Sequence, residues 1–274
     1  MAAFLVRGEH VIPVRRFVPH TVAVAQAAVS ALLRGPTASE RKSGYSSQIP
    51  AWTGLRGISV SRGVATVDLS KRFESGGGSL SMQLRVAQVV YTLTQFPSVS
   101  RVAFRLDGRP VESIGGEGIS VSPPVGRADF EAQNPPILVE QPLPGDIVGA
   151  PILVRGTANV FEARLVVDLV TTNGVLLARR NILATARHWY PGSIQHTAVP
   201  SRGDDAPRNR RVYAFAEERR TNQRRAHSCD GHARELTDAA ERPRRAFVVR
   251  SYPQPESLAP PMQNRRVGRR WCER

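Results

Sequence analysis

The sequence predicts an α/β (α+β) domain, then a partial β-sandwich, then an irregular C-terminal tail. Three observations lead to this fold class. Up to about residue 115, amphipathic helical patterns alternate with short strand patterns. From residue 136 to residue 186, only strand patterns occur, separated by turn residues. After residue 186, no apolar period of 2 or 3.6 residues persists.

A β-hairpin and a helix are predicted at the start of the chain. The stretch FLVRGEHVIPVRRFVP gives two short strand patterns around Gly8-Glu9. Thr21 then suits a helix N-cap. The apolar residues that follow at helical spacing are Val24, Ala28 and Leu32. Gly35-Pro36 predicts the end of this helix, and the polar residues 37–53 are expected to form a loop.

A second hairpin and a longer helix follow. The stretch LRGISVSRGVATVDLS predicts two strands around a turn at Gly63. From Ser79 to Pro97 the apolar spacing predicts an amphipathic helix of about four turns. Its expected outer, polar face consists of Arg85, Gln88, Thr92 and Gln95. The stretch RVAFRLDGRPVES then predicts two strands joined by a type I′ turn at Asp107-Gly108.

A linker and a β-only segment complete the interpretable part of the sequence. Residues 1–115 are taken as the first domain, and residues 116–135, rich in Gly, Pro and Ser, as the linker. Residues 136–186 contain about four strand patterns, with turns expected at Pro144-Gly145-Asp146 and Asn173-Gly174. This close spacing suggests a sandwich of immunoglobulin type, although such a sandwich needs about seven strands.

The charge is unevenly distributed along the chain. The formal net charge is +15, from 38 Lys and Arg against 23 Asp and Glu. Residues 1–186 hold 19 basic and 13 acidic residues, and residues 187–274 hold 19 and 10. Only Lys42 and Lys71 are lysines, which is typical of GC-rich coding DNA rather than of a phosphate-binding surface. A nucleic-acid partner is therefore not expected.

The cysteines and the apolar runs limit the class further. Cys229 and Cys272 both lie in the tail, so residues 1–186 have no thiol ligand and no disulfide. No apolar run approaches the ~20 residues of a membrane span. The N-terminal residues also lack the basic and apolar regions of a secretory signal. Membrane attachment is expected only through a signal or lipid anchor that this chain does not contain.

The glycine-rich stretch SGGGSLS is a candidate phosphate site because backbone N–H groups at a helix start bind anions. A phosphate-binding loop also needs a positioned cation, as in GxxxxGK[ST], and no lysine follows these glycines. We therefore interpret the stretch as a helix start with Ser79 as N-cap.

The sequence gives little support for a metal site or a catalytic site at its other candidate residues. His10 and His20 have no neighbouring Cys or carboxylate cluster and make a poor metal site. Asp68 and Glu74 are better explained as turn and capping residues than as an acid–base pair. A Ser79, His20 and Asp68 triad lacks a nucleophile elbow. We expect the remaining candidates to form solvated surface: Arg15, Arg16, Arg56, Arg62, Arg101, Arg105, Arg109, Trp52 and Phe161.

The quoted stretches resemble the GerMN domain of sporulation and spore germination. VIPVRRFVP, ALLRGPTASE, LRGISVSRGVATVDLS, GGGSLSMQLRVAQVVYTLTQFPSV and FRLDGRPV carry this resemblance over roughly residues 3–115. PPILVEQPLPGDIVGAPILVRGTANVFEARLVVDLVTTNGVLLA looks like the immunoglobulin-like domain of bacterial spore germination that commonly follows GerMN. Such proteins are typically exported, often lipid-anchored envelope proteins of Gram-positive bacteria, including actinobacteria.

The immunoglobulin-like resemblance fades near Ala186, and residues 187–274 are expected to be disordered or out of frame. One permitted coding of Asn222–His232, read one base later, gives Ile-Asn-Val-Val-Arg-Ile-Pro-Val-Met-Val, which resembles the closing strand of such a domain. Because Val212–Glu218 looks native-like in the present frame, a frameshift requires more than one lesion.

The resemblance implies a non-catalytic binding or scaffolding protein of the cell envelope, located outside the membrane. It implies no catalytic, cofactor-binding or metal residue, leaves the binding residues unknown, and suggests envelope proteins or an anionic wall polymer as partners. Two alternatives remain. An enzyme acting on cell wall would need paired carboxylates or a metal in a cleft. A nucleic-acid binder using the arginine-rich tail would bind in a salt-dependent way.

Overall fold

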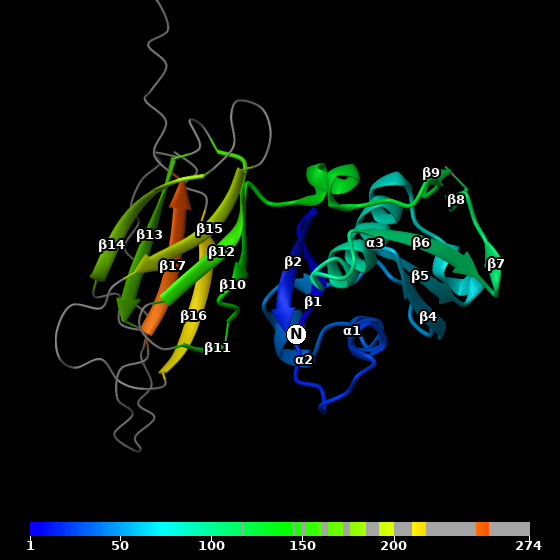
Figure 1. Ribbon diagram of the computed structural model, residues 1–274, viewed down its shortest axis with the longest axis horizontal. Helices are drawn as coiled ribbons and strands as arrows, with labels where there is room; N and C mark the ends of the chain where they lie inside the picture. Colours follow the sequence, from blue (N-terminus) through cyan, green and yellow to red (C-terminus); the bar gives the residue numbers. More distant parts are fainter. Residues whose placement is uncertain are drawn as a thin grey trace, which may run out of the picture.

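Two structural units follow one another along the chain, an α+β domain and a β-sandwich (Figure 1). The computed structural model describes residues 1–116, 118–144, 146–148, 152–160, 164–171, 176–184, 192–199, 210–217 and 245–251. Within these ranges the architecture confirms the predicted α+β domain and the β-sandwich that follows it.

The first sheet of the α+β domain is built on the predicted N-terminal hairpin. Strands β1 (Ala2–Arg7) and β2 (His10–Arg15) pair in antiparallel fashion. Gly8 takes a positive φ of 62° at the turn, which glycine adopts without the steric cost of a Cβ. The two-residue strand β3 (Tyr45–Ser46) pairs with the other side of β1, near its C-terminal end. Among the described residues, no strand therefore lies beside most of that side of β1.

The second sheet has the order β4-β5-β6-β7. Its strands are β4 (Leu55–Ser61), β5 (Val64–Leu69), β6 (Arg101–Leu106) and β7 (Arg109–Pro110). β5 and β6 run parallel because the chain crosses between them through helix α3 (Ser79–Leu93). Asp107 and Gly108 have φ values of 48° and 80°, the two positive values that the predicted type I′ turn requires.

Two shorter helices precede the second sheet. Helix α1 (Val24–Leu33) confirms the predicted helix, but Ala23 is its N-cap, and the Thr21 hydroxyl accepts a hydrogen bond from the Ala23 N–H at 3.1 Å. The prediction of a loop over residues 37–53 is wrong in part, because helix α2 (Ala38–Lys42) lies there. Thr37 and Glu40 form a capping box that starts this helix, and the T-x-x-E spacing in the sequence is its signature.

Helix α3 has the predicted length, but its polar side does not face solvent as expected. Arg85, Gln88 and Thr92 are all buried. The Phe4 N–H donates to the Thr92 hydroxyl at 3.1 Å, and the Phe4 carbonyl accepts from Gln88 at 3.0 Å. Gln88 and Thr92 thus take the place of a neighbouring strand along the unpaired side of β1. Buried polar groups are stable only when hydrogen-bonded, and here the main chain of β1 supplies a partner to each of these two side chains.

The segment after β7 is structured over most of the expected linker. Strands β8 (Ser113–Ile114) and β9 (Ile119–Ser120) pair, and the 3-10 helix η2 (Arg127–Gln133) follows. Val125 and Phe130 are buried in the core of the first domain. The segment therefore packs as part of the α+β domain before the chain enters the sandwich.

The sandwich contains two sheets, ordered β10-β12-β15 and β11-β16-β17-β13-β14. Residues up to 186 supply β10 (Ile137–Gln141), β11 (Asp146–Val148), β12 (Ile152–Ala158), β13 (Arg164–Thr171) and β14 (Leu176–Leu183). The expected turn at Asn173-Gly174 and the residue Phe161 lie outside the described residues. So does Gly145 of the other expected turn.

Three strands of the segment expected to be irregular also pair with these sheets. They are β15 (Gly192–Val199), β16 (Arg210–Glu217) and β17 (Arg245–Ser251). β15 pairs with β12, and β17 lies between β13 and β16. The remainder of the expected tail lies outside the described residues. The proposed frameshift is a property of the gene and stays a prediction.

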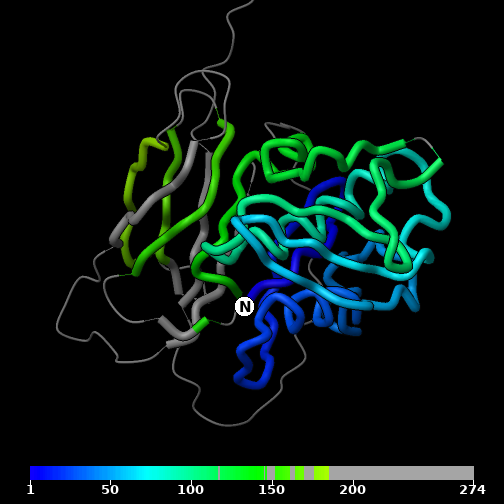
Figure 2. Tube along the Cα trace, turned by 45° about the vertical axis from the view of Figure 1, so that its right-hand side comes forward, coloured from blue at the N-terminus to red at the C-terminus, as the bar shows by residue number. Residues whose placement is uncertain are grey.

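Strand β10 joins the cores of the two units. Ile137 packs in the sandwich core, whereas the next residue, Leu138, packs in the core of the α+β domain. Successive side chains of a strand point to opposite sides, so one short strand serves both cores. Leu143, just after β10, is also buried in the first core. Figures 1 and 2 place β10 and the β1–β2 hairpin where the units meet.

Candidate functional site

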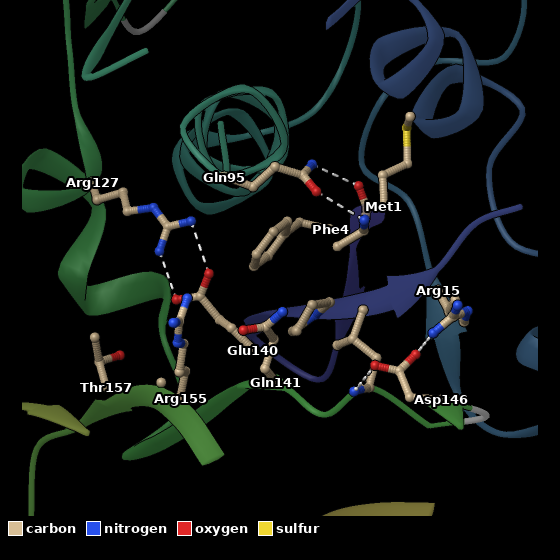
Figure 3. A pocket seen from close by; sticks show the side chains of 14 residues that line it. Met1, Phe4, Arg15, Gln95, Arg127, Glu140, Gln141, Asp146, Arg155 and Thr157 are labelled. Atoms are coloured by element: carbon tan, nitrogen blue, oxygen red, sulfur yellow. Dashed lines mark hydrogen bonds and ion pairs between the residues drawn. The ribbon is translucent and has the colours of Figure 1, made fainter. Parts of the chain in front are cut away.

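A cavity of about 560 Å³ lies at the junction of the two units (Figure 3). Its lining comes from β1, β2, the end of α3, η2, β10, β11 and β12. The residues are Met1, Ala2, Phe4, Pro13, Arg15, Gln95, Arg127, Glu140, Gln141, Leu143, Asp146, Arg155, Gly156 and Thr157. Ligand sites of ~300–1,000 Å³ commonly occur between domains, which makes this cavity the first candidate.

Arg127 and Glu140 form the central ion pair of the cavity. The Arg127 Nη1 and Nη2 atoms lie 2.6 and 2.9 Å from the two Glu140 carboxylate oxygens. The Arg127 Nε also donates to the Thr94 hydroxyl at 2.8 Å, and its guanidinium lies over the ring of Tyr91 at 4.8 Å. A bidentate pair of this kind fixes orientation as well as charge. Since Arg127 belongs to η2 and Glu140 to β10, the pair ties the two units together.

A second ion pair crosses the junction at the other end of the cavity. Arg15 of β2 contacts the Asp146 carboxylate of β11. The other Asp146 oxygen accepts a hydrogen bond from the Leu143 N–H at 2.9 Å, which holds the carboxylate against the main chain at Leu143. Both carboxylates in the cavity therefore have an arginine partner.

Arg155 is the third arginine of the cavity. Its side chain is exposed, and no hydrogen bond or ion pair joins it to another described residue. In Figure 3 it extends from β12 toward the Arg127–Glu140 pair. Both Glu140 oxygens are already bound by Arg127. The Glu140 carboxylate thus lies near the guanidinium groups of both Arg127 and Arg155. The net charge of these three side chains is positive.

The strand pair β10–β12 gives the cavity floor its shape. Gln141 lies opposite Arg155, and Leu138 lies opposite Thr157, so these four side chains share one side of the sheet. A bulge between Val139 and Gln141 interrupts the register beside Gly156. A Cβ on Gly156 would collide with the Leu138 carbonyl oxygen. Only glycine lets the two strands approach this closely.

A smaller cavity of about 280 Å³ lies along the chain that leads into β10. His10 and Asn134 line it, and the His10 Nδ1 and Asn134 Oδ1 atoms are buried without a hydrogen-bond partner in the structure. The Asn134 amide nitrogen donates to the Tyr91 hydroxyl at 2.5 Å. Burial raises the pKa of Tyr91 to about 12, although this hydrogen bond and the nearby Arg127 act in the opposite direction.

The glycine-rich stretch does not form a phosphate cradle. Gly78, not Ser79, is the N-cap of α3, and it provides no side-chain hydrogen bond, so the prediction of Ser79 as N-cap is wrong. The buried Arg85 guanidinium donates to the carbonyls of Phe73, Ser75 and Gly76 at 2.6, 3.2 and 2.9 Å. An anion cradle needs inward N–H groups. Here carbonyl groups face a cation, so the stretch is a helix start.

The other sequence candidates lie apart from the cavity, except Arg15. Asp68 accepts a hydrogen bond from the Gly108 N–H at 3.0 Å, which is the expected turn role. Arg16 pairs with Glu40, and Arg56 pairs with Asp107. His20 and Trp52 are exposed, Trp52 to 88%. No hydrogen bond among Ser79, His20 and Asp68 connects them within the described part of the chain.

Sequence reasoning missed Arg127, Glu140 and Arg155. Arg127 and Glu140 each lie beside apolar residues in short segments, and nothing in their spacing shows that they meet. Arg155 does follow a readable signal, because in VRGTA the polar residues Arg155 and Thr157 alternate with Val154, Gly156 and Ala158, which places both on one side of a strand. Within the described residues, no group of three His, Cys, Asp or Glu side chains is placed to hold a metal ion. In the same part of the chain, no helix combines the length and apolarity that a membrane crossing needs.

Fold and junction together define a protein with an α+β domain fixed to an immunoglobulin-like sandwich. The Germane family, described as sporulation and spore germination, matches residues 4–112. The Gmad2 family, described as the immunoglobulin-like domain of bacterial spore germination, matches residues 136–205. The chain therefore carries a GerMN-type domain followed by this immunoglobulin-like domain, as its sequence predicts. The second match extends beyond residue 186, to the end of β15 and the residues that follow it.

Three solved structures are similar to the chain. The first GerMN domain of the sporulation protein GerM from Bacillus subtilis is 24% identical in sequence to this chain. The match covers 46% of this chain and 96% of the GerM domain, with a TM-score of 0.41. A candidate lipoprotein from Clostridium perfringens is 23% identical, with coverages of 46% and 81% and a TM-score of 0.37. The tandem GerMN domains of GerM are 17% identical, with coverages of 74% and 62% and a TM-score of 0.40. No curated protein matches the chain.

Proposed function

We propose that the protein is a non-catalytic binding or scaffolding component of the cell envelope, located outside the membrane. Its partner is an anionic wall polymer or another envelope protein. Attachment to the membrane, where it occurs, uses a signal or lipid anchor outside these residues. The membership of both domains in spore-germination families supports this proposal.

The junction between the domains is the observation that carries the proposal. The acidic side chains of the cavity, Glu140 and Asp146, are each held in an ion pair that crosses the junction. Apolar packing of Leu138 and Leu143 in the first core accompanies them. Carboxylates engaged in this way stabilise a fixed arrangement of two domains. A composite surface of fixed shape is what a scaffold presents to its partners, since little ordering entropy is then lost on binding.

Co-sedimentation of the full chain with purified Gram-positive cell walls tests the proposal. One sample of walls keeps its anionic polymers and a second is stripped of them by hydrofluoric acid. We expect saturable sedimentation with the walls and no release of soluble wall fragments. A third sample, an envelope membrane fraction with and without protease treatment, detects a protein partner.

Three results would contradict the proposal. Release of wall fragments that depends on the chain would make it an enzyme. Absence of the chain from every wall and membrane pellet would leave no envelope role. Binding to DNA that weakens steeply with salt, in the absence of wall binding, would favour the nucleic-acid alternative.

A further inference from the structure

We propose that the cavity between the two domains binds the anionic group of a sugar acid or sugar phosphate, and that Arg155 is the residue that binds it. This inference deepens the proposed function, because it names the site that would recognise an anionic wall polymer. It rests on the charge balance, the free donors and the shape of the cavity.

The charge balance leaves one arginine available. Arg127 is held by Glu140 and Arg15 by Asp146. Arg155 alone has no carboxylate of its own among the described residues. Because Glu140 supplies a single negative charge beside the guanidinium groups of Arg127 and Arg155, a second anion beside Arg155 would be attracted. A carboxylate or phosphate that enters the cavity would provide this anion and accept two parallel N–H bonds from the Arg155 fork.

Two further polar side chains on the same side of the sheet are free to bind a ligand. Gln141 lies directly opposite Arg155 across the strand pair, and Thr157 follows two residues later on β12. Both line the cavity, and neither side chain has a hydrogen-bond partner within the described ranges. Together with Arg155 they supply a charged fork, an amide and a hydroxyl. Convergent donors of this kind fix the orientation of a polar ligand.

The remaining lining favours a ligand with a ring rather than a bare ion. Phe4, Pro13 and Leu143 are apolar residues of the lining, and all three are largely buried. The volume of about 560 Å³ exceeds what one carboxylate or phosphate fills and suits a sugar that carries one.

The test measures ligand binding by the full chain and by two matched variants. Arg155→Gln removes the proposed binding charge. Arg180→Gln removes an equally exposed arginine of β14, which has no partner within the described residues and lies outside the cavity. The probes are glucuronate, glucose 6-phosphate and tetra-aspartate, with glucose as the neutral control, titrated by ligand-observed saturation-transfer NMR.

We expect both the native chain and Arg180→Gln to bind a sugar anion and not glucose. Arg155→Gln should weaken that binding at least about tenfold, while Arg180→Gln should change it less than about twofold. Thr157→Val should weaken it about threefold, since it removes one neutral hydrogen bond. Preference for glucuronate or for glucose 6-phosphate distinguishes uronate-bearing from phosphate-bearing polymers as the source.

The control for folding is the thermal midpoint, which should agree within about 2 °C among all variants because these side chains make no described contact that folding requires. The inference is wrong if no anion binds, or if Arg155→Gln binds as tightly as Arg180→Gln. It is also wrong if tetra-aspartate binds more tightly than both sugar anions, because the cavity would then accept a protein partner.

The two proposals fail separately. Undiminished wall sedimentation by Arg155→Gln, with no sugar anion bound, would leave the envelope role in place and overturn this site. Arg155-dependent binding of a sugar anion without any wall or membrane sedimentation would establish the site and overturn the envelope role.

Discussion

The side-chain amide of Gln95 binds both main-chain groups of Ala2, accepting from its N–H and donating to its carbonyl, each at 2.8 Å. One side chain just beyond the C-terminal end of helix α3 thus supplies the two hydrogen bonds that a neighbouring strand would give this residue. Thr92 and Gln88 do the same for Phe4, one strand period further along β1. Helix α3 therefore completes the first sheet with its side chains.

Among these three side chains, we expect substitution of Gln88 to lower the stability of the protein most. We expect Gln88→Leu to lower the free energy of unfolding by about 2–3 kcal/mol, because it leaves the Phe4 carbonyl and the Gln48 N–H without their partners in buried surroundings. Urea denaturation followed by circular dichroism measures the change. The control is Gln26→Leu on the exposed side of α1, which should change the free energy by less than about 0.5 kcal/mol. Equal effects of the two substitutions would contradict the interpretation that side chains of α3 replace a neighbouring strand beside β1.

The Arg127–Glu140 pair should contribute to the junction as a coupled unit. A double-mutant cycle with Arg127→Gln and Glu140→Gln should give a coupling free energy of about 1–2 kcal/mol, since the pair is bidentate and only partly exposed. Denaturation of the three variants and the native chain provides the four values. The matched exposed pair is Arg56 with Asp107, for which the same cycle should give less than about 0.5 kcal/mol. A coupling at Arg127–Glu140 no larger than this would show that the pair does not hold the domains.

Gly156 should tolerate no side chain. Gly156→Ala places a Cβ against the backbone of Leu138 and should destabilise the protein by about 3 kcal/mol or more, because a backbone collision cannot relax through a rotamer change. Gly57 in β4 offers the control, since a Cβ there meets no atom within 4 Å. Gly57→Ala should be neutral or slightly stabilising. Thermal unfolding measures the midpoints of both variants. Similar midpoints would contradict the close approach of β12 to β10 at Gly156.

Glu40 should make stability depend on pH in the acid range. Burial acts to raise its pKa, but hydrogen bonds from Arg16 and Thr37 outweigh burial and lower the pKa below its usual value. Its stabilising effect is therefore complete above the pKa of the unfolded chain, at about 4.3, and is lost as pH falls through the lower pKa of the folded chain. Glu40→Gln should cost about 1 kcal/mol at pH 7 and much less at pH 3. Urea denaturation at the two pH values measures this, and a cost independent of pH would contradict it.

The sequence by itself determined the two hairpins, helices α1 and α3 and their order in the first domain, but not helix α2 or the elements of the expected linker. The hairpin turns at Gly63 and Asp107-Gly108 and the periodicity of α3 are local properties, because each depends on residues close together in the chain. The family resemblance likewise required only ordered motifs. The T-x-x-E cap of α2 was available in the same way, although the loop prediction overlooked it.

Only the tertiary structure decided which polar residues are buried and which meet. Gln88, Thr92 and Gln95 repeat with the period of a solvated helix face, and a sequence pattern contains no sign that β1 lacks a neighbour there. The junction cavity depends in the same way on Arg127 and Glu140, whose encounter follows from the placement of β10 against the first domain. A period fixes the direction of a side chain relative to its own element. What lies in that direction depends on contacts between residues distant in the chain, which local patterns do not specify.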